Sequence, residues 1–261
     1  MKKTLLLLVL ISPFVMAFSG CDKDEDDTNN TTGPGTVSFE LTNIVGNVNV
    51  DETGATSYTN ASGESFTISK LKYYISNVQL MKDDAVTFTM PESYFLVDES
   101  NQASTKLSIP DVPAGSYNKI RFLIGVDSAR NVSGAQTGAL TPSDMFWTWS
   151  TGYIFFKMEG SSSASSNGSY IYHIAGFRDA NNTNALRWVE LDFNGSSLIV
   201  DGHRDAEIHA FVNVMKVFDG PPNPISIASH NNVMSTGGVA LQIADNYAGM
   251  FTFDHLHNDP H

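Results

Sequence analysis

The sequence predicts an all-β protein, an antiparallel β-sandwich or Greek-key barrel in which one short C-terminal helix covers an end. Three observations lead to this prediction. Apolar and polar residues alternate with a period of two in segments such as 37–41, as expected of half-buried strands. Twenty Gly and ten Pro among 261 residues supply frequent turns. A hydrophobic fraction of 41% provides enough apolar side chains for a sizeable core.

The expected strands are rich in β-branched or aromatic residues and are bounded by turn residues. In chain order they are 37–41, two stretches within 66–81, then 93–97, 106–109, 120–124, 153–158, 170–174, 189–193 and 208–214. Residues 82–84 and 112–117 are expected to form turns, and the Ser-rich stretch 161–168 is expected to be a hairpin loop.

One segment near the C-terminus departs from the period of two. Apolar residues recur there at spacings of three and four, at Val239, Ala240, Ile243, Ala244, Tyr247 and Phe251. This spacing predicts a short amphipathic helix, with Ser235 or Thr236 as its N-cap. The helix is expected to cover an open end or edge of the sheet, since an uncovered edge invites aggregation.

The N-terminal segment has the pattern of an exported lipoprotein. Lys2 and Lys3 precede an apolar run over 5–18, which is too short to span a membrane and closes on a Phe-Ser-Gly-Cys sequence resembling a bacterial lipobox. We therefore expect a signal peptide over 1–20, a lipidated Cys21 that anchors the protein to the membrane, an acidic and polar linker over 21–35, and a single β domain over 36–261.

The acidic run after Cys21 also resembles the surface-export signal of lipoproteins in the Bacteroidetes group. This resemblance implies an outer-membrane lipoprotein at the cell surface, with the periplasmic face as the alternative. Acidic residues outnumber basic ones by 28 to 15. A nucleic-acid partner is excluded because it requires a basic face.

Motifs that would indicate an enzyme are absent from the sequence. The chain has no phosphate-binding loop, no dinucleotide fingerprint, no nucleophile elbow and no His-Glu-x-x-His zinc motif. The single Cys excludes a disulfide framework and a multi-Cys metal site. We therefore expect a binding protein and not an enzyme.

Histidine and tryptophan are the residues most able to form a binding site. If the segment is extended, Trp147 and Trp149 point to one face, either as packing residues or as an aromatic platform. Seven His in a chain with one Cys favour a copper or zinc site. His209 is expected on the strand face opposite the apolar side chains. A local metal site at 254–257, around the His255-x-His257 pair, is a further possibility.

Several of these motifs together resemble the MbnP-like family. They are residues 113–117 and 123–127, the aromatic block 145–160 with 138–142 before it and 172–174 after it, and the tail 243–247 with 250–251. The resemblance covers about 37–257 and implies an all-β, extracytoplasmic copper-binding protein associated with methanobactin. It implies a copper ion bound by His side chains and by a tryptophan oxidised to kynurenine. The oxidation would come from a partner dihaem enzyme related to MauG and bacterial cytochrome c peroxidases.

Transferred to this chain, the resemblance implies His173 as the first copper ligand, His230 as the second and His257 as the third. Trp147 or Trp149 is the implied site of oxidation, and His203, His209 and His261 have no support from the family pattern. Some relatives carry an Asn-His pair before the aromatic block, whereas no His precedes His173 in this chain. The alternative function is a surface β-sandwich module that binds glycans or peptides through an aromatic platform, without a metal.

Overall fold

The computed structural model describes residues 32–131, 136–148, 152–178, 184–220 and 223–260. These residues all belong to one compact unit, 32–261, which is distinct from the unit formed by 1–31. Within the described part of the chain, no helix has the length and apolar character needed to cross a membrane. Cys21, Trp149 and His261 lie outside the described residues, so the leader and its lipidation stay predictions.

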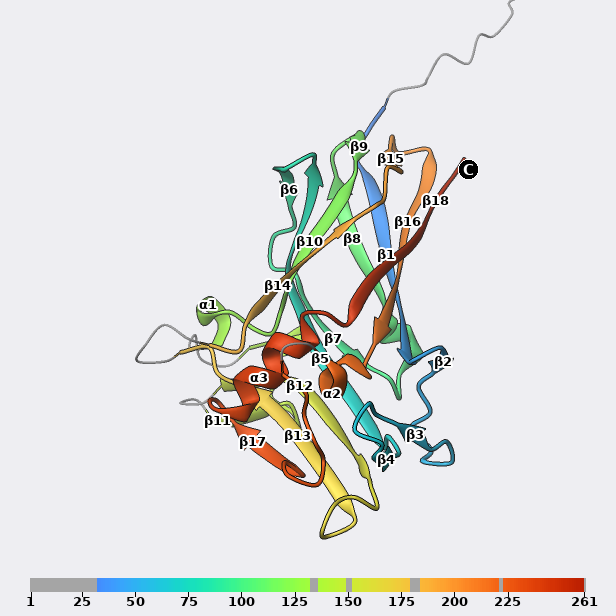
Figure 1. Cartoon of the computed structure of the whole chain (residues 1–261). Helices are drawn as coiled ribbons and strands as arrows, with labels where there is room; N and C mark the ends of the chain where they lie inside the picture. The colour runs from blue at the N-terminus through green and yellow to red at the C-terminus, as the bar shows by residue number, and fades with distance from the viewer. Residues whose placement is uncertain (1–31, 132–135, 149–151, 179–183, 221–222, 261) are drawn as a thin grey trace, which may run out of the picture. The chain divides into compact units, whose positions relative to one another are not determined.

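A five-stranded sheet carries the face on which the candidate site lies (Figure 1). Its strands follow the order β18 (Phe251–Pro260), β16 (Arg204–Asn213), β1 (Gly35–Val45) and β2 (Val48–Asn49), and β8 (Lys106–Val112) also pairs with β1. β1 runs parallel to β16, and the other pairs are antiparallel.

A nine-stranded sheet is built around the 13-residue strand β5 (Lys70–Lys82). Its main order is β14 (Arg187–Asp192), β10 (Lys119–Ile124), β5, β12 (Gly152–Ser161), β13 (Ser169–Ala175) and β17 (Asn232–Ser235), with β6 (Ala85–Thr89), β7 (Tyr94–Asp98) and β11 (Phe146–Thr148) attached. The first half of β5 pairs with β12 and β7, and its second half pairs with β10 and β6. β5 therefore belongs to both halves of the sheet, the half with β10 and β14 and the half with β12, β13 and β17.

The remaining elements are short. Two small sheets pair β3 (Tyr58–Thr59) with β4 (Ser65–Phe66) and β9 (Gly115–Tyr117) with β15 (Leu198–Val200). The helical segments are α1 (Ser128–Asn131), α2 (Lys216–Asp219) and α3 (Val239–Tyr247), with 3-10 turns at Gln102–Thr105 and Gly138–Leu140.

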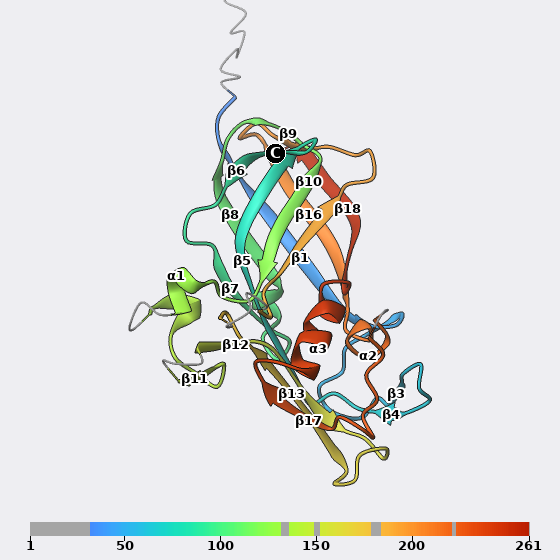
Figure 2. The ribbon, with the colours of Figure 1, turned by 60° about the vertical axis from the view of Figure 1, so that its left-hand side comes forward.

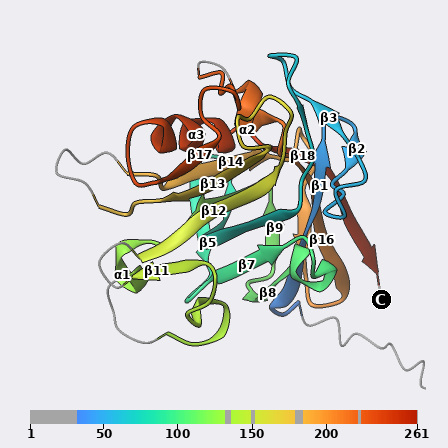
Figure 3. The same cartoon turned by 90° about the horizontal axis from the view of Figure 1, so that it is seen from below.

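The predicted C-terminal helix is confirmed as α3, which lies beside α2 over the end of the sheet that holds β12, β13 and β17 (Figures 2 and 3). The ring of Tyr247 packs 5.7 Å from that of Phe156. The predicted cap is wrong, because Gly238 occupies the N-cap position and no side chain caps the helix. Phe251 belongs to β18 and not to the helix.

The core lies between the two large sheets. Alternate residues of β1 turn inward, and Phe39 packs 5.5 Å from Phe122 of β10. Phe251 of β18 lies 4.9 Å from Phe122 and 6.0 Å from Tyr73 of β5, centroid to centroid. Burying one such aromatic side chain stabilises the fold by roughly 1.5–3 kcal/mol. These contacts hold β1 and β18 against the core, and the buried Ile208 and Ala210 hold β16 there, so that the outer face of β16 and β18 is left to solvent.

The all-β prediction is confirmed, and each expected strand overlaps an observed one. The prediction of purely antiparallel pairing is incomplete, because β1–β16 and β13–β17 are parallel. Parallel neighbours require a long connection between them, and both pairs join segments far apart in the sequence. Such pairing depends on chain topology, which the period of the side chains does not reveal.

Candidate metal centre

A β-bulge in β18 determines which of its side chains reach the outer face of the five-stranded sheet. Phe253 pairs with Ala210, whereas His255 pairs with His209, so Asp254 is an extra residue in the ladder. An inserted residue reverses the facing of all side chains beyond it. Phe251 and Phe253 therefore contact the core before the bulge, and Leu256 does so after it.

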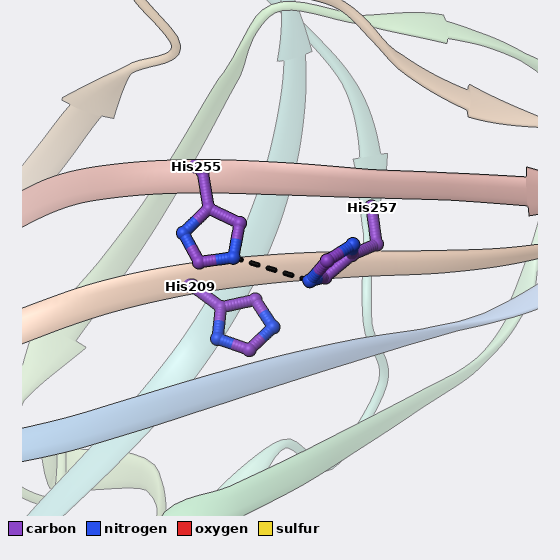
Figure 4. A group of neighbouring side chains, drawn as sticks. All are labelled: His209, His255 and His257. Carbon is purple, nitrogen blue, oxygen red and sulfur yellow. Dashed lines mark hydrogen bonds between the residues drawn. The ribbon is translucent and has the colours of Figure 1, made fainter.

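As a result, three imidazoles meet on the outer face. His209 comes from β16, and His255 and His257 come from β18; we call these residues the three-histidine cluster (Figure 4). One ring nitrogen of each lies within 4.8 Å of the other two. The rings of His209 and His255 stack with centroids 4.3 Å apart and planes 12° apart, and the ring of His257 stands nearly perpendicular to both.

The nitrogens of the cluster are only partly satisfied by protein partners. His255 Nε2 and His257 Nε2 are 3.1 Å apart, so one of them must donate a proton to the other. His209 Nε2 is buried and has no hydrogen-bond partner. An unmade hydrogen bond at a buried polar atom costs about 1–3 kcal/mol. A metal ion bound to His209 Nε2 would give this nitrogen a partner and remove that cost.

The spacing of the nitrogens fits a metal ion. Two ligands about 2.0–2.1 Å from one ion lie about 2.9 Å apart at the right angle of a tetragonal copper site and about 3.3 Å apart at a tetrahedral angle. The His255 and His257 nitrogens, 3.1 Å apart, lie between these values. Asp254 Oδ2 lies 2.9 Å from His255 Nδ1, and Asp259 Oδ2 lies 3.6 Å from His257 Nδ1. The hydrogen-bonded Asp254 carboxylate can fix the orientation of the His255 imidazole, whereas the Asp259 carboxylate adds negative charge beside His257.

Acidic side chains adjoin the cluster on β16 and β1. Glu40, Glu207 and His209 also bring ligand atoms within 4.8 Å of one another, so His209 belongs to both groups. Burial raises the pKa of the Glu207 carboxyl, but the hydrogen bond and charge of Lys106 outweigh it and leave that pKa below its ordinary value. Glu207 is therefore a carboxylate at neutral pH, which favours cations at this face.

His173, the first ligand implied by the family resemblance, lies in a different environment on β13. Its Nε2 is 2.7 Å from Glu159 Oε1, and its Nδ1 is buried without a hydrogen-bond partner. Lys157 donates to Asp144 Oδ2 at 3.0 Å and lies 3.7 Å from Glu159. We call His173, Glu159, Lys157 and Asp144 the His173 network. Burial lowers the pKa of His173, and the charges of Lys157 and Lys70 lower it further against the opposing effect of Glu159.

The other predicted ligands are separated from one another. His230 precedes β17, and its backbone N–H donates to Ser226 O at 2.9 Å. His173 pairs with Met234 of β17, whereas His230 lies before that strand begins, and neither histidine belongs to a group of three or more ligand residues in the described part of the chain. His257 lies on the five-stranded sheet. Of the three implied ligands, only His257 belongs to a cluster of ligand atoms in the described residues.

Trp147 is the one described member of the implied oxidation pair. It lies on β11 and is a partly buried residue that packs against the core. β11 pairs with β12 of the nine-stranded sheet, whereas the three-histidine cluster lies on the five-stranded sheet. An oxidised Trp147 and the three-histidine cluster would therefore occupy different sheets.

Sequence reasoning did not select His209, and it considered His255 only as part of a local pair. The expectation that His209 faces away from the apolar side chains of its strand is confirmed, because its neighbours Ile208 and Ala210 are buried. The His-x-His pattern was a second usable signal. The missing information was the pairing of β16 with β18, which brings the two signals to one place.

Comparison with known proteins gives one family and one solved structure. The family model MbnP matches residues 34–235. MbnP from Methylosinus trichosporium is 12% identical, with a TM-score of 0.44, and the match covers 78% of this chain and 82% of that one. No curated protein matches the sequence. The family match includes His209 and ends before β18, which carries His255 and His257.

Proposed function

Because this chain belongs to the MbnP family, we propose that it is an extracytoplasmic copper-binding protein that holds one ion at the three-histidine cluster. The observation that carries the proposal is the convergence of three ring nitrogens within 4.8 Å of one another. Imidazole is a ligand suited to copper, and the buried, unpaired Nε2 of His209 would gain a partner on binding. His209, His255 and His257 would hold the ion.

The proposed role is binding without turnover. His255 and His257 have side chains 47% and 45% exposed, so an ion can enter from solvent and leave again. A bound copper ion supplies Lewis acidity and redox activity, whereas the protein's residues fix its position through the imidazoles and their carboxylate partners. This arrangement suits a protein that captures, stores or passes on copper.

We further propose that this site does not require oxidation of Trp147, which lies on the other large sheet. Oxidation of Trp147 or Trp149 by a dihaem partner stays a prediction. Protein produced in a host without such an enzyme is expected to bind copper. Loss of binding in that host, with binding in the native host, would assign the site to an oxidised tryptophan.

We propose that the protein is an outer-membrane lipoprotein that faces the cell surface. A lipid anchor at Cys21 would then hold the copper site near the membrane. The support is the lipobox-like sequence that ends at Cys21 and the acidic run that follows it. Cys21→Ala is expected to move the protein from the membrane fraction to the soluble fraction. Unchanged membrane association of the variant would contradict the anchor.

The site is tested by titrating Cu(II) into the purified full chain and recording electron paramagnetic resonance. We expect one tightly bound equivalent with hyperfine coupling from three nitrogens. His209→Ala, His255→Ala and His257→Ala should each weaken binding by about 100-fold or more, since even residues behind a ligand contribute 10–100-fold. The exposed His203 serves as the control, and His203→Ala should bind as the wild type does.

The same titration distinguishes the three-histidine cluster from the set implied by the family resemblance. His173→Ala and His230→Ala are expected to retain binding. If these two variants lose copper while His209→Ala and His255→Ala retain it, the ion lies at the resemblance-implied set. If the wild type binds no copper, the proposed function is wrong.

A further inference from the structure

Glu207 lies beside the three-histidine cluster in the position of an additional ligand. It precedes His209 by two residues on the same face of β16, and its cross-strand partner is His257. Glu207 Oε2 is 3.6 Å from His209 Nε2, and both side chains are 18% exposed. This separation is too long for a hydrogen bond but close to that of two ligands on one ion.

Lys106 holds this carboxylate from two strands away. It lies on β8, opposite Glu40 of β1, and its ammonium passes over β1 to form an ion pair with Glu207 on β16. The same ammonium is 3.7 Å from Glu40 Oε2. Lys106 therefore lies where it neutralises the carboxylates next to the cluster.

The surroundings allow Lys106 to leave this position. Its side chain is 50% exposed, and an open hollow of about 420 Å³ lies beside it, lined in part by Lys106, Glu207 and His257. Water occupies about 30 Å³ per molecule in the liquid, so the hollow has room for the displaced ammonium and for water. An exposed ion pair contributes about 1 kcal/mol at most, so its loss is a small cost.

We propose that Glu207 is the fourth ligand of the ion in the three-histidine cluster and that Lys106 competes with the ion for this carboxylate. The inference rests on the proposed function and adds a selectivity to it. The Lys106 ammonium contacts Glu207 Oε1, whereas Oε2 of the same carboxylate faces His209. A divalent ion on Oε2 and an ammonium on Oε1 repel each other, so binding is favoured when Lys106 moves away. Three imidazoles and a carboxylate, without sulfur, favour Cu(II) over Cu(I).

The test compares the affinities of the full chain for Cu(II) and for Cu(I) in Lys106→Met and Glu207→Gln. Lys106→Met should tighten Cu(II) binding by up to about fivefold, the factor that corresponds to the loss of one exposed ion pair. Glu207→Gln should weaken Cu(II) binding about 10- to 100-fold and keep the signature of three nitrogens. The affinity of Glu207→Gln for Cu(I) should fall by a smaller factor than its affinity for Cu(II). In the double variant the gain from Lys106→Met should shrink, because the two residues act through one contact.

The matched control is Lys119, which also bridges two carboxylates, with Nζ 2.9 Å from Asp84 Oδ1 and 3.1 Å from Glu190 Oε1. Lys119 is on the nine-stranded sheet, and Lys119→Met should leave copper affinity unchanged. Unchanged or weaker Cu(II) binding in Lys106→Met, or unchanged binding in Glu207→Gln, overturns this inference and leaves the three-histidine site intact. A wild type that binds no Cu(II) overturns both.

Discussion

The three-histidine cluster and the His173 network both combine imidazole with carboxylate on the face of a large sheet. In the cluster, three imidazoles meet beside one lysine, Lys106, whose side chain is 50% exposed. In the network, a single imidazole is accompanied by lysines already bound to the carboxylates. Asp144 alone contacts Lys157 at 3.0 Å, Lys72 at 3.4 Å and Lys70 at 3.7 Å.

The difference shows what separates a metal site from a structural ion network. In the His173 network, Lys157 is buried and supplies the positive charge that the carboxylates need, so an added cation would meet repulsion. In the three-histidine cluster, the imidazole and carboxylate groups that can bind a metal outnumber the neighbouring lysine, Lys106. Residue type alone therefore does not identify the site; the number of converging imidazoles and the local lysine charge decide it.

The largest expected effect comes from removing the bulge that creates the cluster. Deleting Asp254 should turn His255 and His257 away from His209 and reduce Cu(II) affinity by about 100-fold or more, since the ion loses two ligands. Asp254→Ala keeps the extra residue and loses only the contact to His255, so about tenfold weaker binding is expected. A Cu(II) titration of both variants, with thermal unfolding to verify the fold, checks this. Equal affinities in the two variants would contradict it.

An intermediate effect is expected on stability, where Lys157 should contribute more to the free energy of unfolding than Lys106. Lys157→Met takes the buried lysine away from Glu159 and removes one of the three lysines that contact Asp144, and should lower the free energy of unfolding by about 2 kcal/mol. Lys106→Met removes an ion pair whose lysine is half exposed, and should change the free energy of unfolding by about 1 kcal/mol at most. Urea denaturation of the metal-free proteins measures both values. A larger loss for Lys106→Met would reverse the assignment of structural and competing lysine.

The smallest effect is the pH dependence contributed by His173. Its pKa in the folded protein is lowered from the ordinary 6.5, chiefly by burial. The unfolded chain therefore binds a proton at this residue more readily. The stability that His173 contributes is present above pH 6.5 and is lost as the pH falls from 6.5 toward the folded-state pKa. His173→Asn should flatten the slope of unfolding free energy against pH in this range, and an unchanged slope would contradict the assignment.

The strands were predictable because their side chains alternate, and α3 was predictable because Ala240, Ile243 and Tyr247 follow the helical repeat. β18 was not predicted as a strand because its alternation is interrupted. Phe251 and Phe253 face inward, and without the bulge His255 and His257 would follow them into the core. A bulge depends on the partner strand as well as on local sequence, so the alternation alone does not reveal it.

The candidate site was predictable only in parts. His257 was predicted from the family resemblance, and the outward facing of His209 followed from its strand period. Their meeting depends on the pairing of β16 with β18. Residues 209 and 255 are remote in sequence, and no periodicity encodes which strands become neighbours. The same limit applies to the His173 network. Its lysines could not be linked to His173 from the sequence, because their contacts form only in the folded chain.

The extra residue at Asp254 also has an evolutionary consequence. The family match ends before β18, so two of the three imidazoles lie beyond the matched segment. The gain or loss of one codon between Phe253 and His255 is enough to exchange an inward-facing pair of histidines for an outward-facing one. A metal site of this kind can therefore arise or disappear in a lineage through a single small insertion or deletion, while the matched part of the gene stays unchanged.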